Sequence, residues 1–211
     1  LNTDLRLEPD LAESWDISSD GTVYTFKIRE NAKFHNGKQV TATDFKWSLE
    51  RAANPQTVSP VAETYLNDIV GVMDVIEGRT LYITGIKVID DLTLQTTIDA
   101  PKAYFLAKLT YPTAFVVDRE NVESGGQTWT DDINGTGPFK LKEYRIGERI
   151  VLERFDNSDK NTGGVELIVM NLAGGQSMAM YENNEIDITG VGLFDLERVL
   201  DPNEPLNREL V

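Results

Sequence analysis

The sequence lacks cysteine altogether and has a single histidine among its 211 residues. Without cysteine the chain can form no disulfide, no thiolate metal site and no cysteine nucleophile. With one histidine, any Ser-His-Asp or histidine–metal mechanism would depend on His35, which lies beside an Asn-Gly turn. We expect His35 to be a solvent-exposed turn residue. The commonest catalytic and metal-binding arrangements are therefore disfavoured.

Basic charge and long apolar runs are also scarce. The chain carries 20 Lys and Arg against 35 Asp and Glu, which gives a net charge of −15. A field of that sign repels phosphate backbones, so we expect no nucleic-acid partner. The acidity favours a role in solubility over attraction of a cationic ligand. No apolar run reaches the ~18 residues of a membrane-spanning helix. Leu1 to Asp10 lacks the basic-then-apolar order of residues that a secretion signal has.

What is present indicates a globular protein with a core, since apolar residues make up 40% of the chain. The length allows one or two domains. The sequence begins without Met and stops at Val211, within what resembles the start of a strand. We therefore expect it to be a piece of something longer.

Residues 1–117 carry alternating strand and helix signals. Two β-prone runs, Trp15–Ser18 and Thr22–Arg29, predict a hairpin. Thr41 and Asp44 are spaced as a capping box, ahead of a helix that ends near Asn54-Pro55. Four further elements are expected: a helix from Ser59-Pro60 to Gly78, a hairpin of Ile86–Val88 with Leu92–Ile98, a helix over Ala103–Leu109 and a strand over Phe115–Val117.

Residues 118–211 begin with a loop-rich stretch, so we place a domain boundary near Val117. The expected elements are a third hairpin of Phe139–Tyr144 with Arg149–Phe155, a buried-type strand over Val165–Met170, a helix over Gln176–Asn183, a strand over Ile186–Thr189 and a helix over Leu193–Leu200. Strand, helix, strand, helix suggests parallel pairing in this block. The fold class expected for the chain is α/β in the sense of mixed α+β.

Several polar motifs could in principle carry chemistry, but turns and loops explain them better. Asp90-Asp91 and Asp131-Asp132 could supply a glycosidase pair, yet neighbours in a strand face opposite sides and Asp is common in turns. Asp156–Gly163 has the composition of a calcium loop, but Lys160 occupies a ligand position. Asn134–Pro138 holds a Gly-x-Gly with a proline where a phosphate-binding helix would begin. We expect no metal and no cofactor, and binding is favoured over catalysis.

The motifs occur in a fixed order along the whole chain: Leu11–Trp15, Thr25–Arg29, Phe34–Gly37, Val40–Phe45, Ser59-Pro60, Gly85–Asp91, Asn134–Phe139, Glu148–Leu152 and Glu185–Ile188. This set resembles the family 5 extracellular solute-binding proteins, the ligand-capturing subunits of oligopeptide, dipeptide and nickel ABC importers. An ordered set of this size is specific, whereas Asn-Gly-Thr-Gly-Pro alone would be weak.

The resemblance implies part of a type II periplasmic-binding-protein-like fold. Residues 1–117 would be an accessory lobe, and residues 118–211 the incomplete middle segment of the first ligand-binding lobe. In oligopeptide-binding members an aromatic residue after the Ser-Pro pair reaches the cleft. Here that position is Val61, with Tyr65 one turn later, although both could simply pack in the core. The loop after Glu185–Ile188 also lines the cleft, which implicates Gly190 and Val191, where members often carry bulky polar residues.

The function implied is capture of a peptide or similar small solute outside the cytoplasmic membrane, by a periplasmic or lipid-anchored protein that docks on an ABC permease. We expect the chain alone to bind no di- to pentapeptide. Two other classes stay open: an enzyme such as a carboxylate-pair hydrolase, and a non-transport extracellular interaction or sensor module that uses the same fold.

Overall fold

The computed structural model describes residues 2, 4–156, 158 and 162–211. The chain divides into two compact units: unit 1 comprises Leu1–Leu141 and Glu153–Glu166, and unit 2 comprises Lys142–Leu152 and Leu167–Val211. The expected division into lobes at residue 117 stays a prediction. Within the described part of the chain, no helix is long and apolar enough to cross a membrane.

Unit 1 is built on a four-stranded antiparallel sheet with the strand order β1-β2-β4-β3. Its strands are β1 (Ala12–Ile17), β2 (Val23–Ile28), β3 (Ile86–Asp90) and β4 (Thr93–Thr97). Both expected hairpins are confirmed. The register of β2 on β4 places Phe26 opposite Leu94, so the apolar residues of the two hairpins share one face of the sheet.

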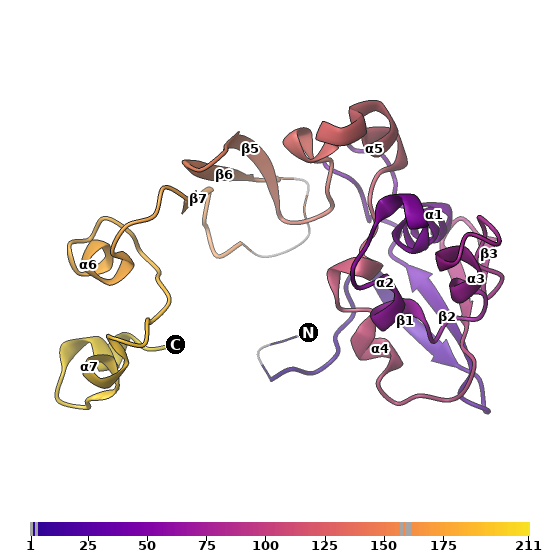
Figure 1. Ribbon diagram of the computed structural model, residues 1–211, viewed down its shortest axis with the longest axis horizontal. Coiled ribbons are helices and arrows are strands. Elements are labelled where there is room, and N and C mark those ends of the chain that lie inside the picture. The colour runs from indigo at the N-terminus through magenta and orange to yellow at the C-terminus, as the bar shows by residue number, and fades with distance from the viewer. Residues whose placement is uncertain (1, 3, 157, 159–161) are drawn as a thin grey trace. The chain divides into compact units, whose positions relative to one another are not determined.

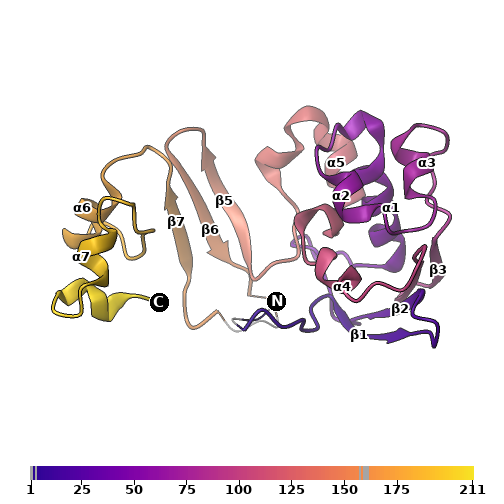
Figure 2. The ribbon, with the colours of Figure 1, turned by 60° about the horizontal axis from the view of Figure 1, so that its bottom comes forward.

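The helices of unit 1 are α1 (Ala42–Ala53), α2 (Ala62–Leu66), α3 (Val72–Ile76), α4 (Phe105–Lys108) and α5 (Arg119–Gly125). The capping box is confirmed at the start of α1: the Asp44 amide donates to Thr41 Oγ1 at 3.4 Å, and the Thr41 amide donates to Asp44 Oδ2 at 2.9 Å. Helix α1 packs against β3 and β4, and α1, α2 and α3 lie on the same side of the sheet (Figures 1 and 2).

A continuous hydrophobic core lies between these helices and the sheet. Its largest fully buried side chains are Phe34, Phe105, Ile28, Leu66, Ile69, Ile83, Ile98, Val40, Val72 and Val75. They come from strands, helices and connecting segments alike, so the core fixes the turns as well as the regular elements.

Three expectations for the secondary structure of unit 1 are wrong. The helix from Ser59 to Gly78 is two helices, because Gly71 adopts a left-handed φ of 82° and leaves no room for a side chain: a Cβ there would lie 2.3 Å from Thr84 Oγ1. Residues 115–117 form no strand, since the Val117 amide donates to Ser48 Oγ at 3.0 Å instead of to a neighbouring strand. The stretch after Val117 is helical, with α5 followed by a 3-10 segment at Gly126–Asp132. Further 3-10 segments are Pro55–Thr57, Pro112–Ala114 and Pro205–Glu209.

A second sheet has the order β5-β6-β7, formed by β5 (Phe139–Arg145), β6 (Arg149–Arg154) and β7 (Leu167–Asn171). This confirms the third hairpin and the strand after it. The Arg154 amide donates to Glu166 O and the Leu172 amide to Glu148 O, both at 2.8 Å. The partners run in opposite directions along the chain, so β6 and β7 are antiparallel.

Unit 2 contains two short helices, α6 (Ser177–Glu182) and α7 (Leu196–Leu200), as expected. The prediction of a strand over Ile186–Thr189 is wrong, and so is the predicted parallel pairing, because none of the described strands hydrogen-bonds to this segment. The buried character expected for Val165–Met170 is also wrong, since Leu167 and Val169 are exposed. The expected fold class, a mixture of helix and sheet, is confirmed.

Candidate functional site

The first pair of predicted ligand-binding residues lies at the start of α2 in unit 1. Val61 precedes the helix, and its carbonyl accepts the Tyr65 amide at 3.1 Å. At the start of this helix the Ser59 hydroxyl accepts the Ala62 amide at 3.2 Å. The half-buried ring of Tyr65 stacks on Tyr111, with centroids 3.7 Å apart and planes 6° from parallel. One face of Tyr65 is therefore occupied by packing.

The second pair lies in unit 2, in the irregular segment between α6 and α7. Gly190 and Val191 are both exposed, and a Cβ at Gly190 would meet no atom within 4 Å. This segment has backbone groups that no strand partner engages, because the expected strand before it does not form. The four predicted positions are thus divided equally between the two units.

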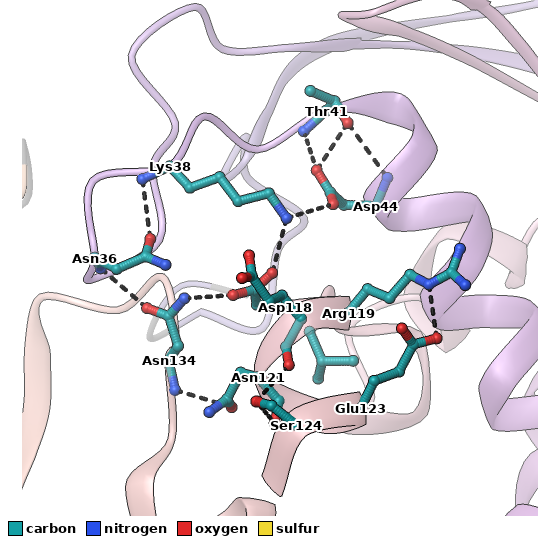
Figure 3. A network of polar contacts seen from close by, with 12 residues as sticks. Asn36, Lys38, Thr41, Asp44, Asp118, Arg119, Asn121, Glu123, Ser124 and Asn134 are labelled. Atoms are coloured by element: carbon teal, nitrogen blue, oxygen red, sulfur yellow. Dashed lines mark hydrogen bonds and ion pairs between the residues drawn. The ribbon is translucent and has the colours of Figure 1, made fainter.

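A buried carboxylate, Asp118, is the centre of a polar network that sequence reasoning missed (Figure 3). Its side chain is 2% exposed. Lys38 Nζ donates to Asp118 Oδ1 at 2.8 Å, and Asn134 Nδ2 donates to Asp118 Oδ2 at 2.7 Å. Asn134 Oδ1 in turn accepts the Asn36 amide at 3.0 Å. The network joins three segments that are far apart in the sequence: the Asn36-Gly37 turn, the start of α5 and the loop before β5.

Charge explains why Asp118 tolerates burial. Burial raises the pKa of the Asp118 carboxyl, but the hydrogen bonds from Lys38 and Asn134 outweigh it, and the net pKa lies below 3.8. The hydrogen bond to Asp118 raises the pKa of Lys38, with a smaller contribution from the charge of Asp44. Lys38 therefore connects Asp118 to the capping box of α1, where Nζ lies 3.5 Å from Asp44 Oδ1. The ion pair between Lys38 and Asp118 holds the segment after the Asn36-Gly37 turn to the start of α5.

Asp68 is a second buried carboxylate, 3% exposed, and it was also missed. It accepts Lys102 Nζ at 2.5 Å and Lys108 Nζ at 2.6 Å, one on each oxygen. Burial raises the pKa of Asp68, yet the two lysines bring the net pKa below its ordinary value. The cluster fastens the segment between α2 and α3 to α4, close in sequence to Tyr65.

His35 is not the exposed turn residue that the sequence predicts. Its ring is half-buried against Phe155, with centroids 5.0 Å apart. Nε2 lies 2.9 Å from Gly137 O, and Nδ1 lies 3.3 Å from the Gly135 amide. The Asn-Gly turn is confirmed, with Gly37 at a φ of 87°. The error arose because the partners of His35 are about a hundred residues away, as the separation of 102 to Gly137 shows.

The other polar motifs behave as turns or surface segments. Asp90 Oδ1 accepts the Leu92 amide at 2.9 Å, as expected for an Asx-type turn. Asp131 and Asp132 are exposed in the 3-10 segment after α5. The calcium-like motif Asp156–Gly163 lies partly outside the described residues, namely at 157 and 159–161. Across the described chain, no group of three or more His, Asp or Glu side chains could hold a metal ion.

Unit 1 also contains an apolar cavity of about 580 Å³ between the sheet, α1 and the segment before α5. Its walls are mostly aromatic and aliphatic, and they include Trp15, Phe26, Phe45, Leu106, Phe115 and Trp129. The guanidinium of Arg51 lies over the Trp129 ring, 5.2 Å from its centroid. The cavity could accommodate apolar groups but has few polar groups that would orient them.

Comparisons with known proteins identify what the chain is similar to. The sequence model of the family described as bacterial extracellular solute-binding proteins, family 5 middle, matches residues 6–207. The chain is 37% identical over 189 residues to the periplasmic oligopeptide-binding protein OppA of Escherichia coli K12, covering 86% of this chain and 34% of that protein. It is 34% identical over 215 residues to the dipeptide-binding protein DppE of Bacillus subtilis 168, covering 95% and 38%. The chain thus spans little more than a third of the length of these relatives.

Solved structures agree with the sequence relatives. Listeria monocytogenes OppA bound to peptide superimposes with a TM-score of 0.84 at 27% identity, over 96% of this chain and 42% of that one. Haemophilus influenzae OppA in complex with RPPGFSPFR gives a TM-score of 0.83 at 28% identity, over 92% and 40%. The architecture implied by the motif order is therefore confirmed for the part of the fold that this chain covers.

Proposed function

Because the chain belongs to family 5 of the bacterial extracellular solute-binding proteins, we propose that it forms one part of the solute-binding subunit of an ABC importer. In this role the protein captures peptides or a similar small solute outside the cytoplasmic membrane and delivers them to a permease in that membrane. The observation that carries the proposal is the family match over residues 6–207, together with 37% identity to a protein named for oligopeptide binding.

Each lobe has its own task in this proposal. Residues 1–117 form the accessory lobe, whose core and buried ion pairs of Asp68 with Lys102 and Lys108 give a rigid support. Residues 118–211 form the middle segment of the first ligand-binding lobe, and the second ligand-binding lobe lies in the part of the relatives that this chain does not match. Closure of two lobes around a solute buries it and supplies contacts from both sides, so affinity requires both.

The residues proposed to line the cleft suit recognition of a main chain more than of a particular side chain. Gly190 and Val191 offer no charged or hydrogen-bonding side chain, but their backbone groups are exposed and could pair with an extended peptide. Val61 and Tyr65 offer an apolar wall and one aromatic ring. Such a lining supports binding rather than catalysis, in keeping with relatives that are named as binding proteins.

A chimera tests the proposal. The segment of Escherichia coli OppA that aligns with this chain is replaced by residues 6–207, and peptide uptake is measured in cells that lack their own OppA. We expect uptake to be restored, because the transplanted segment supplies the same wall of the cleft. A control chimera with Ile146→Ala, an exposed residue between β5 and β6, should perform equally. Secretion of a folded chimera that binds no peptide in calorimetry would overturn the proposal.

A further inference from the structure

The two ring nitrogens of His35 have different partners, and these fix the protonation state of the ring. A carbonyl only accepts hydrogen bonds, so the nitrogen 2.9 Å from Gly137 O, Nε2, must carry a proton. A backbone amide only donates, so Nδ1, 3.3 Å from the Gly135 nitrogen, must be unprotonated. The geometry therefore requires a neutral imidazole in the Nε2–H form.

Protonation of Nδ1 would break this arrangement. The ring would then present a donor to the Gly135 amide, which is itself a donor, and that hydrogen bond would be lost. The packing of the ring edge-on against Phe155 limits how far it can turn away. The half-buried position adds a desolvation cost for the charged form.

The charged groups around the turn favour the same state. Burial lowers the pKa of His35 most, the hydrogen bond to Gly137 raises it, and the charge of Lys140 on β5 lowers it. Lys140 itself pairs with Glu153 at 3.2 Å. The other nearby charges, Lys38 and Asp118, pair with each other at 2.8 Å. Among the described groups, none supplies a carboxylate that contacts the imidazole and would stabilise its cation.

We propose that His35 is a pH-responsive latch for the loop Asn134–Pro138, in which the hydrogen bond from the Gly135 amide to Nδ1 is made while the imidazole is neutral and is lost when it is protonated. Two contacts between the same segments do not depend on the ring: the His35 amide donates to Gly135 O at 2.8 Å, and the Asn36 amide donates to Asn134 Oδ1 at 3.0 Å. Protonation therefore frees the Gly135 amide, which lies five residues before Lys140 of β5, whereas the Nε2–H bond to Gly137 O and both of these contacts remain.

The stability of the latch follows from the direction of the pKa. Because the folded pKa of His35 is lowered, the stabilisation is fully present above the ordinary value of 6.5 and decreases as pH falls through that value toward the folded pKa. Acidification below pH 6.5 is the range in which the loop responds. This inference does not rest on the proposed transport function, since it needs only the described contacts.

The single histidine makes the test direct, because nitrogen-15 NMR of the chain shows one imidazole. We expect the Nε2–H tautomer at pH 8, a titration midpoint below 6.5, and a Gly135 amide signal that moves with the same midpoint. In His35→Phe, which keeps an aromatic ring beside Phe155 but cannot titrate, the Gly135 signal should not move over this range. An Nδ1–H tautomer, a midpoint at or above 6.5, or a Gly135 signal that does not follow the ring would each overturn the proposal.

Two glycine variants provide a matched control within the same loop. Gly135→Ala places a methyl group against the imidazole, whereas a Cβ at Gly137 would have Phe139 O as its nearest contact, at 3.7 Å. We expect the first change to displace the His35 midpoint toward that of a free histidine and the second to leave it unchanged. Equal displacement by both variants would contradict a latch formed by the ring.

Discussion

The two units of this chain differ in how much of their apolar surface they bury. Every member of the main hydrophobic cluster lies in unit 1, whereas unit 2 buries only Val151, Met178 and Val199 among its described hydrophobic residues. In unit 2, Ile188 and Leu193 are 89% and 88% exposed. Local patterns specify helices and strands in both units, but a core needs a second layer of elements, which unit 1 has in its helices and sheet.

The largest expected effect on stability comes from a change of phenylalanine to alanine, made once in each unit. Phe34→Ala in unit 1 should lower the free energy of unfolding by about 3–5 kcal/mol, because the ring is fully buried and leaves a cavity. Phe194→Ala in unit 2 should change it by less than about 0.5 kcal/mol, because that ring is exposed. Urea denaturation followed by circular dichroism measures both. Similar losses of unfolding free energy for the two variants would contradict the proposed difference in burial between the units.

A smaller effect is expected from the buried ion pairs that occur in unit 1. Asp68→Asn should cost about 3 kcal/mol, because it removes the charge that two lysines share and leaves these cations near each other. Asp187→Asn in unit 2, an exposed position, serves as the matched control and should leave the unfolding midpoint in urea unchanged. If the Asp68 variant were as stable as the control, the Asp68 cluster would have no structural role.

The pH dependence of stability should reflect the buried carboxylates of unit 1. The folded pKa values of Asp68 and Asp118 lie below 3.8, so their stabilisation is fully present above pH 3.8 and is lost as pH falls through the folded values. Unfolding measured between about pH 5 and pH 2 should therefore show a steeper loss for the wild type than for Asp118→Asn. Parallel curves for the two proteins would show that Asp118 keeps its ordinary titration after folding.

The features that the sequence predicts are those whose causes are local. The capping box of Thr41 and Asp44, the Asn-Gly turn and the three hairpins each depend on residues a few positions apart, and all are present. The strand at Ile186–Thr189 failed because a strand exists only when another lies beside it. No sequence pattern within Ile186–Thr189 indicates whether a neighbouring strand is present.

The site features that were missed depend on distant partners. Lys38 and Asp118 are 80 residues apart, and His35 is 100 residues from Gly135. Weak signals did exist, since Asp118 directly follows an apolar triplet and Asp68 stands between Leu66 and Ile69. An acid within an apolar run is a candidate for a buried ion pair, although its cationic partner cannot be read from the run itself.

Calorimetric titration of the purified chain with di- to pentapeptides tests most directly whether this polypeptide supplies only one side of a ligand site. We predict no saturable heat for the chain alone and saturable binding for the OppA chimera under identical conditions, because affinity depends on contacts from two lobes. Saturable binding of a peptide by the chain alone, in the micromolar range or tighter, would contradict this account.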